Sequence, residues 1–167
     1  GSALLNYYPA VAEAFYSQIP LVVISADRPQ SKIDIGDGQT IRQENVFANH
    51  SLYNANLLEK VSTQNDNNIQ MALQVAVAHK GPVHINIPLD EPLYKTVDAL
   101  SVFPKSIDVS IKPQKIEEYA LQTYLEDWNT ATKKMVLVGV NYPNSVDAKW
   151  IEELAEDESV IVFTETT

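Results

Sequence analysis

Three polar side chains in the segment 20–43 have types and positions suited to binding an anionic molecule. An apolar run over 21–26 stops at Asp27-Arg28-Pro29, and Gln39 and Gln43 follow in a long polar stretch. The planar guanidinium of arginine matches a carboxylate or phosphate. Side-chain amides donate to and accept from hydroxyl and carboxyl groups. The pattern therefore indicates recognition of a small molecule carrying such groups.

A structural explanation also exists for each of these residues. Arg28 could pair with Asp27 or Asp34 to hold its loop, and spacing alone slightly favours that pairing over ligand binding. Gln39 and Gln43 would share one face of a helical turn. For these two amides, an ordinary solvated surface is the simpler interpretation and is favoured by sequence alone.

The surrounding elements alternate between helix and strand. The pattern predicts helices over 6–17 (capped by Asn6), 44–48 and 65–80, and strands over 21–26 (covered on both faces), 52–58 and 83–87. This alternation indicates right-handed crossovers and an α/β fold, a three-layer αβα arrangement with a parallel sheet. Ligands bind beyond the carboxyl ends of such strands, which is where Arg28 falls.

A second α/β unit is expected over 113–167, after a linker over 95–112. Prolines at 92, 104 and 113 punctuate a stretch without sustained periodicity. The second unit should contain helices over 116–131 and 145–156 and strands over 135–138 and 160–163. Two strands are too few for a stable sheet. We therefore expect the chain to be a piece of a longer protein.

Composition excludes several classes of function. The 167 residues include no cysteine and carry a formal net charge of −10, which argues against disulfides, thiolate metal sites and a nucleic-acid-binding surface. No apolar run is long enough for a membrane span. The histidines have no metal or triad spacing, so no metal site is expected, and His84 is interpreted as a satisfied core residue.

Several motifs together are similar to one enzyme family. They are the stretches over 1–14 and 20–29, the loop residues 34–36, 39–43 and 46–47, and the runs 81–88 and 91–93. They resemble the thiamine-diphosphate enzymes of menaquinone biosynthesis that join 2-oxoglutarate to isochorismate. The resemblance implies that residues 1–94 are the C-terminal half of a pyrimidine-binding domain and residues 113–167 the start of a Rossmann-like central domain. It also implies a cytoplasmic homodimer or homotetramer with its active site at the subunit interface.

For individual residues, the resemblance implies that Arg28 contacts a substrate carboxylate, that Gln39 is a second substrate contact, and that Asn6 lies near the cofactor. The family's activating glutamate would precede residue 1, and its site for Mg²⁺ or Mn²⁺ would follow residue 167. No catalytic or metal-binding residue is therefore expected here, and the chain alone should be inactive and bind no thiamine diphosphate. Some members have Asn where this chain has Gly38, which puts the loop's substrate geometry in doubt.

Alternatives to this interpretation concern both the motif and the function. Gly36-Asp37-Gly38 with Asn67-Asn68 is similar to the family's metal motif. No buried strand leads into Gly36, however, so we interpret the two glycines as residues that allow the loop its backbone conformation.

The chain could belong instead to another thiamine-dependent decarboxylase or acetolactate synthase, against which Asp27-Arg28-Pro29 and Gln39 argue. It could also be a noncatalytic α/β assembly module.

Overall fold

The chain folds as two compact α/β units, Gly1–Lys112 and Pro113–Thr167. The computed structural model describes residues 1–90, 94, 96–100, 102–103, 115–141 and 145–165. Most of the expected linker over 95–112 lies outside the described residues. That the first unit is the C-terminal half of a pyrimidine-binding domain and the second the start of a central domain stays a prediction.

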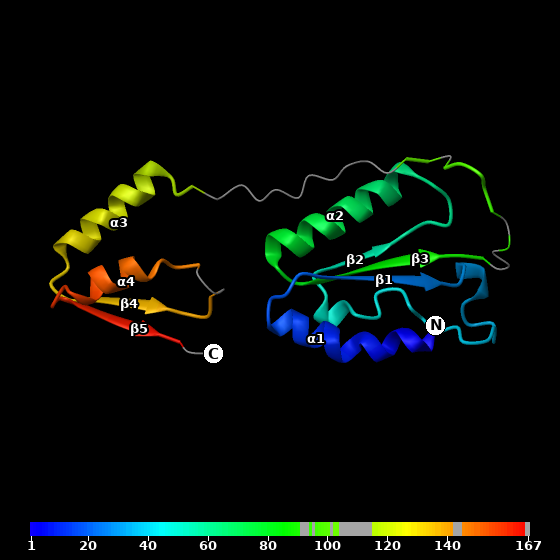
Figure 1. Ribbon diagram of the computed structural model, residues 1–167, viewed down its shortest axis with the longest axis horizontal. Coiled ribbons are helices and arrows are strands. Elements are labelled where there is room, and N and C mark those ends of the chain that lie inside the picture. The colour runs from blue at the N-terminus through cyan, green and yellow to red at the C-terminus, as the bar shows by residue number, and fades with distance from the viewer. Residues whose placement is uncertain (91–93, 95, 101, 104–114, 142–144, 166–167) are drawn as a thin grey trace. The chain divides into compact units, whose positions relative to one another are not determined.

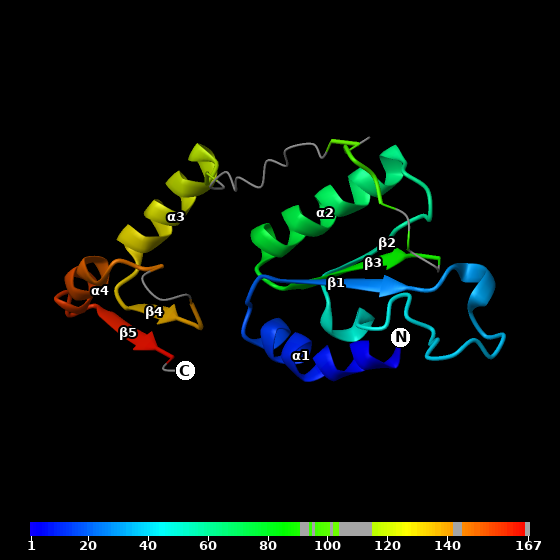
Figure 2. The ribbon, with the colours of Figure 1, turned by 45° about the vertical axis from the view of Figure 1, so that its right-hand side comes forward.

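The first unit has a parallel sheet between two helical layers (Figures 1 and 2). Its strands are β1 (Leu21–Asp27), β2 (Tyr53–Asn56) and β3 (Pro82–Pro88), in the order β1-β3-β2. One face packs against α1 (Tyr8–Tyr16) and the other against α2 (Thr63–His79). Short 3-10 turns are η1 (Ser2–Tyr7), η2 (Gln30–Lys32) and η3 (Ala48–His50). The predicted α/β class with parallel strands is confirmed.

The core of this unit consists of one apolar cluster on each face of the sheet. Between α2 and the sheet lie Ala55, Ala72, Ala76, Val83 and Ile85. On the α1 face lie Leu4, Val11, Val23 and Phe47. Because β3 is the central strand, most of its residues are buried. Val83 and Ile85 belong to the α2-side cluster, whereas the ring of His84 packs against Phe47 on the other face.

Local capping differs from the sequence prediction at both helices. Asn6 lies inside η1 and makes no capping bond, and α1 begins at Tyr8 with a proline in its first turn. Ser62 caps α2 by accepting from the backbone N–H of Asn65 over 3.2 Å. The Asn65 side chain instead bonds to the backbones of Leu58 and Lys60. A serine three residues ahead of Asn65 thus takes the cap that the amide was expected to provide.

Two further predictions are wrong. Residues 44–48 form turns and the start of η3 rather than a helix, with Asn45 at a φ of 56°.

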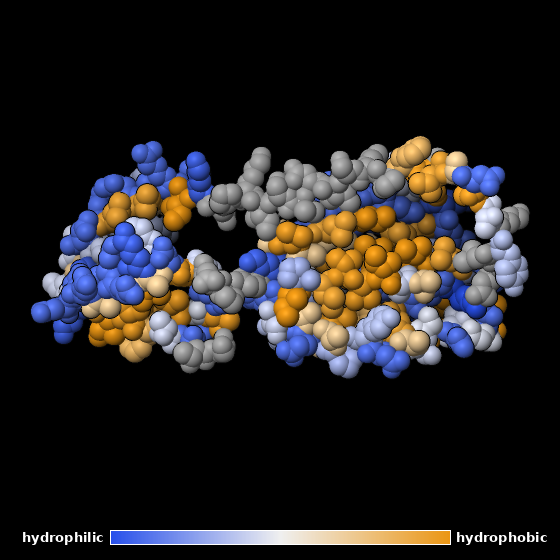
Figure 3. Space-filling model, viewed as in Figure 1, coloured by the Kyte–Doolittle hydropathy of each residue, from blue (hydrophilic) through white to orange (hydrophobic). Residues whose placement is uncertain are grey.

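Strand β1 is buried on one face only, since Val22 and Ile24 are 37% and 62% exposed. Figure 3 shows the broad apolar surface on this side of the first unit. The apolar run was expected to be covered on both faces, but the described residues cover one.

The second unit contains the predicted elements with slightly different bounds. They are α3 (Glu118–Thr130), β4 (Lys134–Val138), α4 (Ala148–Ala155) and β5 (Val160–Thr164), and the two strands pair in parallel. Asp147 caps α4 by accepting from the backbone N–H of Lys149. Across both units, none of the helices described has the length and apolar character needed to cross a membrane.

Candidate substrate site at the carboxyl edge of the sheet

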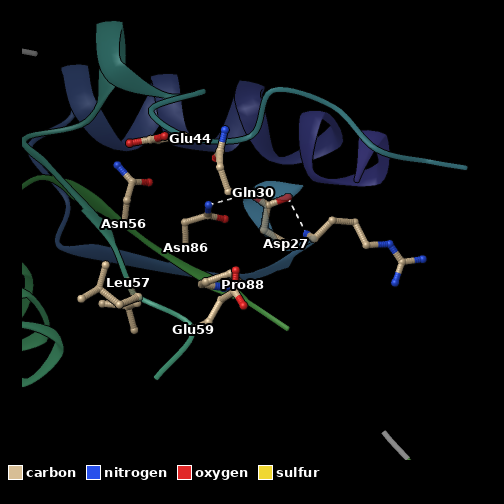
Figure 4. A pocket seen from close by; sticks show the side chains of 10 residues that line it. Asp27, Gln30, Glu44, Asn56, Leu57, Glu59, Asn86 and Pro88 are labelled. Carbon is tan, nitrogen blue, oxygen red and sulfur yellow. Dashed lines mark hydrogen bonds between the residues drawn. The ribbon is translucent and has the colours of Figure 1, made fainter. Parts of the chain in front are cut away.

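A pocket of about 290 Å³ opens where the parallel strands end. Asp27 closes β1, Pro88 closes β3 and Asn56 closes β2, so the three strands deliver side chains to one edge. The pocket is lined by Asp27, Arg28, Gln30, Glu44, Asn56, Leu57, Leu58, Glu59, Asn86 and Pro88. In the view of Figure 4, Glu44 and Glu59 lie on opposite sides of Asn86 and Asp27. A neighbouring pocket of about 280 Å³ shares Asp27, Gln30 and Glu44.

Arg28 reaches this pocket and is held by its own loop. Its Nε lies 3.5 Å from Oδ2 of Asp37, and the two side chains are 27% and 37% exposed. Asp27 accepts from the backbone N–H of Arg28, whereas Asp34 pairs with Arg42. Asp37 is thus an ion-pair partner of Arg28 that was not named from sequence. A partly exposed pair of this kind contributes little to stability.

Gly36-Asp37-Gly38 forms part of the loop around Arg28. Gly36 has a φ of 86°, a conformation that glycine adopts without strain. Asp37 pairs with Arg28, and Asn68 lies on α2, where it accepts from the Tyr53 hydroxyl. Within the described part of the chain, no three His, Cys, Asp or Glu residues are grouped as metal ligands would be.

Gln43 is buried, contrary to the surface interpretation made from sequence. Its side chain is only 1% exposed. Its Nε2 donates to the carbonyl oxygen of Ala26 over 2.7 Å, to Oδ1 of Asn86 over 2.8 Å and to Oγ of Ser25 over 3.1 Å. A buried amide with this many partners is a structural connector between the loop and the strand ends.

A polar network continues from Gln43 into the sheet. Ser25 donates to Oδ1 of Asn86 over 3.0 Å, and its oxygen lies 2.7 Å from Nε2 of His84. Asn86 donates from Nδ2 to Oδ2 of Asp27 over 2.8 Å. The network thus runs from the sheet interior to the rim of the pocket.

Only one of the two ring nitrogens of His84 has a hydrogen-bond partner among the described residues, although sequence predicted a core residue with all its hydrogen bonds made. It is fully buried, and its Nδ1 has no hydrogen-bond partner within the described structure. Burial lowers the pKa of His84 to about 4, despite the opposing effect of the Asp27 charge. The imidazole is therefore neutral near pH 7.

Gln39 and Asn6 are both exposed. Gln39 has a φ of 60° and lies in a turn, so it does not share a helical face with Gln43. Neither Gln39 nor Asn6 lines the two pockets described above. The structure brings Arg28 to the pocket, while the roles expected for Gln39 and Asn6 stay predictions.

The sequence is closely similar to a set of curated proteins with one shared name, 2-succinyl-5-enolpyruvyl-6-hydroxy-3-cyclohexene-1-carboxylate synthase. Over the whole chain, the identity is 64% to that of Flavobacterium psychrophilum, 57% to that of Flavobacterium johnsoniae and 53% to that of Christiangramia forsetii. The chain belongs to this synthase family. It spans 30%, 30% and 32% of the length of these three relatives. No protein-family model matches the sequence.

The buried polar residues behind this candidate site were not predicted from sequence. Ser25, His84 and Asn86 are polar residues within apolar strands, and the last two lie two residues apart, on one face of β3. That alternation is a usable signal for a polar layer inside the sheet. Gln43 offers no comparable signal, because a turn rather than a periodic element places it.

Proposed function

We propose that the full-length protein decarboxylates 2-oxoglutarate and adds the resulting succinyl-semialdehyde unit to isochorismate. It would thus be a transferase of menaquinone biosynthesis. The observation that carries the proposal is the position of Arg28, at the carboxyl edge of the sheet in a chain that is up to 64% identical to synthases of this name. Both proposed substrates carry carboxylates, which the arginine fork suits.

The charge distribution around the pocket supports this role for Arg28. Among the described residues that line this 290 Å³ pocket, Arg28 is the one cation, whereas Asp27, Glu44 and Glu59 contribute carboxylates. A substrate carboxylate would be repelled by these three and attracted to Arg28, so the pocket favours one orientation of the molecule. Gln39 would add a neutral hydrogen-bonding group to the same loop.

Thiamine diphosphate with Mg²⁺ or Mn²⁺ would supply the electron sink for the decarboxylation. The residues described here do not fit its metal site, since Asp37 is engaged with Arg28 and no cluster of metal-ligating side chains occurs among them. We therefore assign this chain the binding and orientation of substrate. We further propose a cytoplasmic homo-oligomer in which other segments of the synthase hold the cofactor at a subunit interface.

The test is an assay of the full-length protein with thiamine diphosphate, Mg²⁺, 2-oxoglutarate and isochorismate. We expect carbon dioxide release coupled to consumption of isochorismate. A parallel reaction with pyruvate in place of 2-oxoglutarate serves as the control for acetolactate-synthase chemistry. Turnover of pyruvate without turnover of 2-oxoglutarate would contradict the proposal and favour the other thiamine-dependent branch.

A further inference from the structure

Gln43 connects the two loop segments that carry the proposed substrate contacts. Along the chain it lies four residues after Gln39. In space its side chain is buried against the end of β1, immediately before Arg28. The exposed Gln39 thus precedes Gln43 along the chain, and the half-buried Arg28 follows the strand end to which the Gln43 side chain is hydrogen-bonded.

The contacts of Gln43 form a continuous path to the backbone of Arg28. Gln43 donates to Oδ1 of Asn86, Asn86 donates to Oδ2 of Asp27, and Oδ1 of Asp27 accepts from the backbone N–H of Arg28 over 2.8 Å. A second, shorter path runs from Gln43 to the carbonyl oxygen of Ala26. Each path crosses from the loop to the strand end.

The two amides of this network each have one fixed orientation. The carboxylate of Asp27 and the carbonyl of Ala26 can only accept, which fixes the orientation of the Asn86 and Gln43 amides. Ser25 donates to Oδ1 of Asn86 and accepts from Nε2 of Gln43, and in the tautomer protonated at Nε2 His84 also donates to the serine oxygen. The unpartnered Nδ1 of His84 is then a bare lone pair rather than a stranded donor. A buried network with this many hydrogen bonds holds its members rigidly.

We propose that Gln43 is a positioning residue that sets the distance between Arg28 and Gln39 and does not itself touch substrate. This inference rests on the proposed function for its kinetic consequence. Its structural consequence, a loop held against the ends of β1 and β3, can be measured without activity. A substrate bound at two points is sensitive to small displacements between them.

The test compares Gln43→Met with wild type in the full-length enzyme. Methionine keeps the length of the side chain and removes its donors, so Asn86 and Ala26 lose a partner. Hydrogen–deuterium exchange of peptides covering residues 26–44 should become faster. The KM for at least one carboxylate substrate should rise about tenfold, with a smaller change in kcat. Gln70→Met, at an exposed glutamine of α2, is the matched control and should change neither readout.

A background of Arg28→Ala with Gln39→Ala separates positioning from general destabilisation. There, Gln43→Met should raise KM less than about twofold further, because its effect passes through the two removed side chains. If Gln43→Met raised KM in that background by the same factor as in wild type, the inference would be overturned. Unchanged hydrogen–deuterium exchange over residues 26–44 would overturn it as well. If wild type turns over neither substrate, the proposed function fails while the exchange comparison still decides whether Gln43 holds the loop. Gln43→Asn, which retains the amide at shorter reach, replaces the methionine variant if that one does not fold.

Discussion

Asn86 donates to Oδ2 of Asp27 over 2.8 Å while the other oxygen of the same carboxylate accepts from the backbone N–H of Arg28, also over 2.8 Å. A carboxylate with hydrogen bonds on both oxygens has a fixed orientation. The main chain at Arg28 is therefore set by β1 and β3 together rather than by its loop alone. Arg28 is among the residues that line the pocket, and its side chain is partly exposed.

Removing the guanidinium should weaken substrate binding. In the full-length enzyme, we expect Arg28→Ala to raise the KM for a carboxylate substrate by on the order of tenfold or more, because a charge-assisted contact is lost. Arg28→Lys should recover only part of this, since an ammonium cannot make the planar two-point contact. Steady-state kinetics with each substrate varied in turn measures both effects.

A charge-matched control for the arginine variants is Lys115→Ala, at an exposed position of the second unit. It removes one positive charge far along the chain from the pocket residues and should leave both KM values within about twofold of wild type. Equal kinetics in wild type and Arg28→Ala would rule out substrate binding by Arg28.

Arg28 could be placed from sequence because its position depends on strong local signals. An apolar strand that ends at Asp27 and a parallel sheet together fix the edge at which the next residue emerges. Its ion-pair partner could not be predicted, because three aspartates lie within nine residues of it and only the folded loop selects Asp37.

The buried amide of Gln43 could not be found in the same way. Glutamine is mostly exposed in proteins, and Gln43 was interpreted as a surface residue ahead of a short helix expected over 44–48. The turn at Asn45 instead directs the chain so that Gln43 enters the sheet edge. The cap of α2 shows a related ambiguity, because Ser62 and Asn65 are both good capping residues and tertiary contacts engage the Asn65 side chain elsewhere.

The 167-residue chain should not bind thiamine diphosphate at micromolar concentration, even with Mg²⁺ present. The described residues offer no group of three His, Cys, Asp or Glu side chains for the metal, and Asn6 is exposed on η1. Isothermal titration calorimetry of this chain should show no saturable heat. The full-length enzyme under the same conditions is the positive control, and micromolar binding by the chain alone would contradict the prediction.

Acid should destabilise the first unit through His84. The pKa of His84 is about 4 in the folded chain, against about 6.5 when unfolded. Between these two pH values His84 is protonated in the unfolded chain but not in the folded chain. The free energy of unfolding therefore falls as the pH falls from 6.5 towards 4. Between pH 7 and pH 5 the loss from this residue is about 2 kcal/mol.

Urea titrations followed by circular dichroism at pH 7 and pH 5 measure this loss. In His84→Gln the dependence on pH should be smaller by about that amount. His79→Gln, at the exposed last residue of α2, should retain the wild-type dependence. The same loss of stability in both variants would show that the pH effect originates outside His84.

Gly81 is required by a close contact rather than by its backbone conformation. The left-handed residue at the end of α2 is Lys80, with a φ of 50°. A Cβ added at Gly81 would lie 2.5 Å from Cδ1 and 2.9 Å from Cγ of Leu52. Gly81→Ala should therefore destabilise the chain by about 1–3 kcal/mol through overpacking, measured by urea titration at pH 7. The variant carrying both Gly81→Ala and Leu52→Ala should be more stable than the sum of the two single effects predicts, because the shortened side chain makes room for the new methyl group. Strict additivity would instead mean that the added methyl group is accommodated by a shift of the backbone, without involving Leu52.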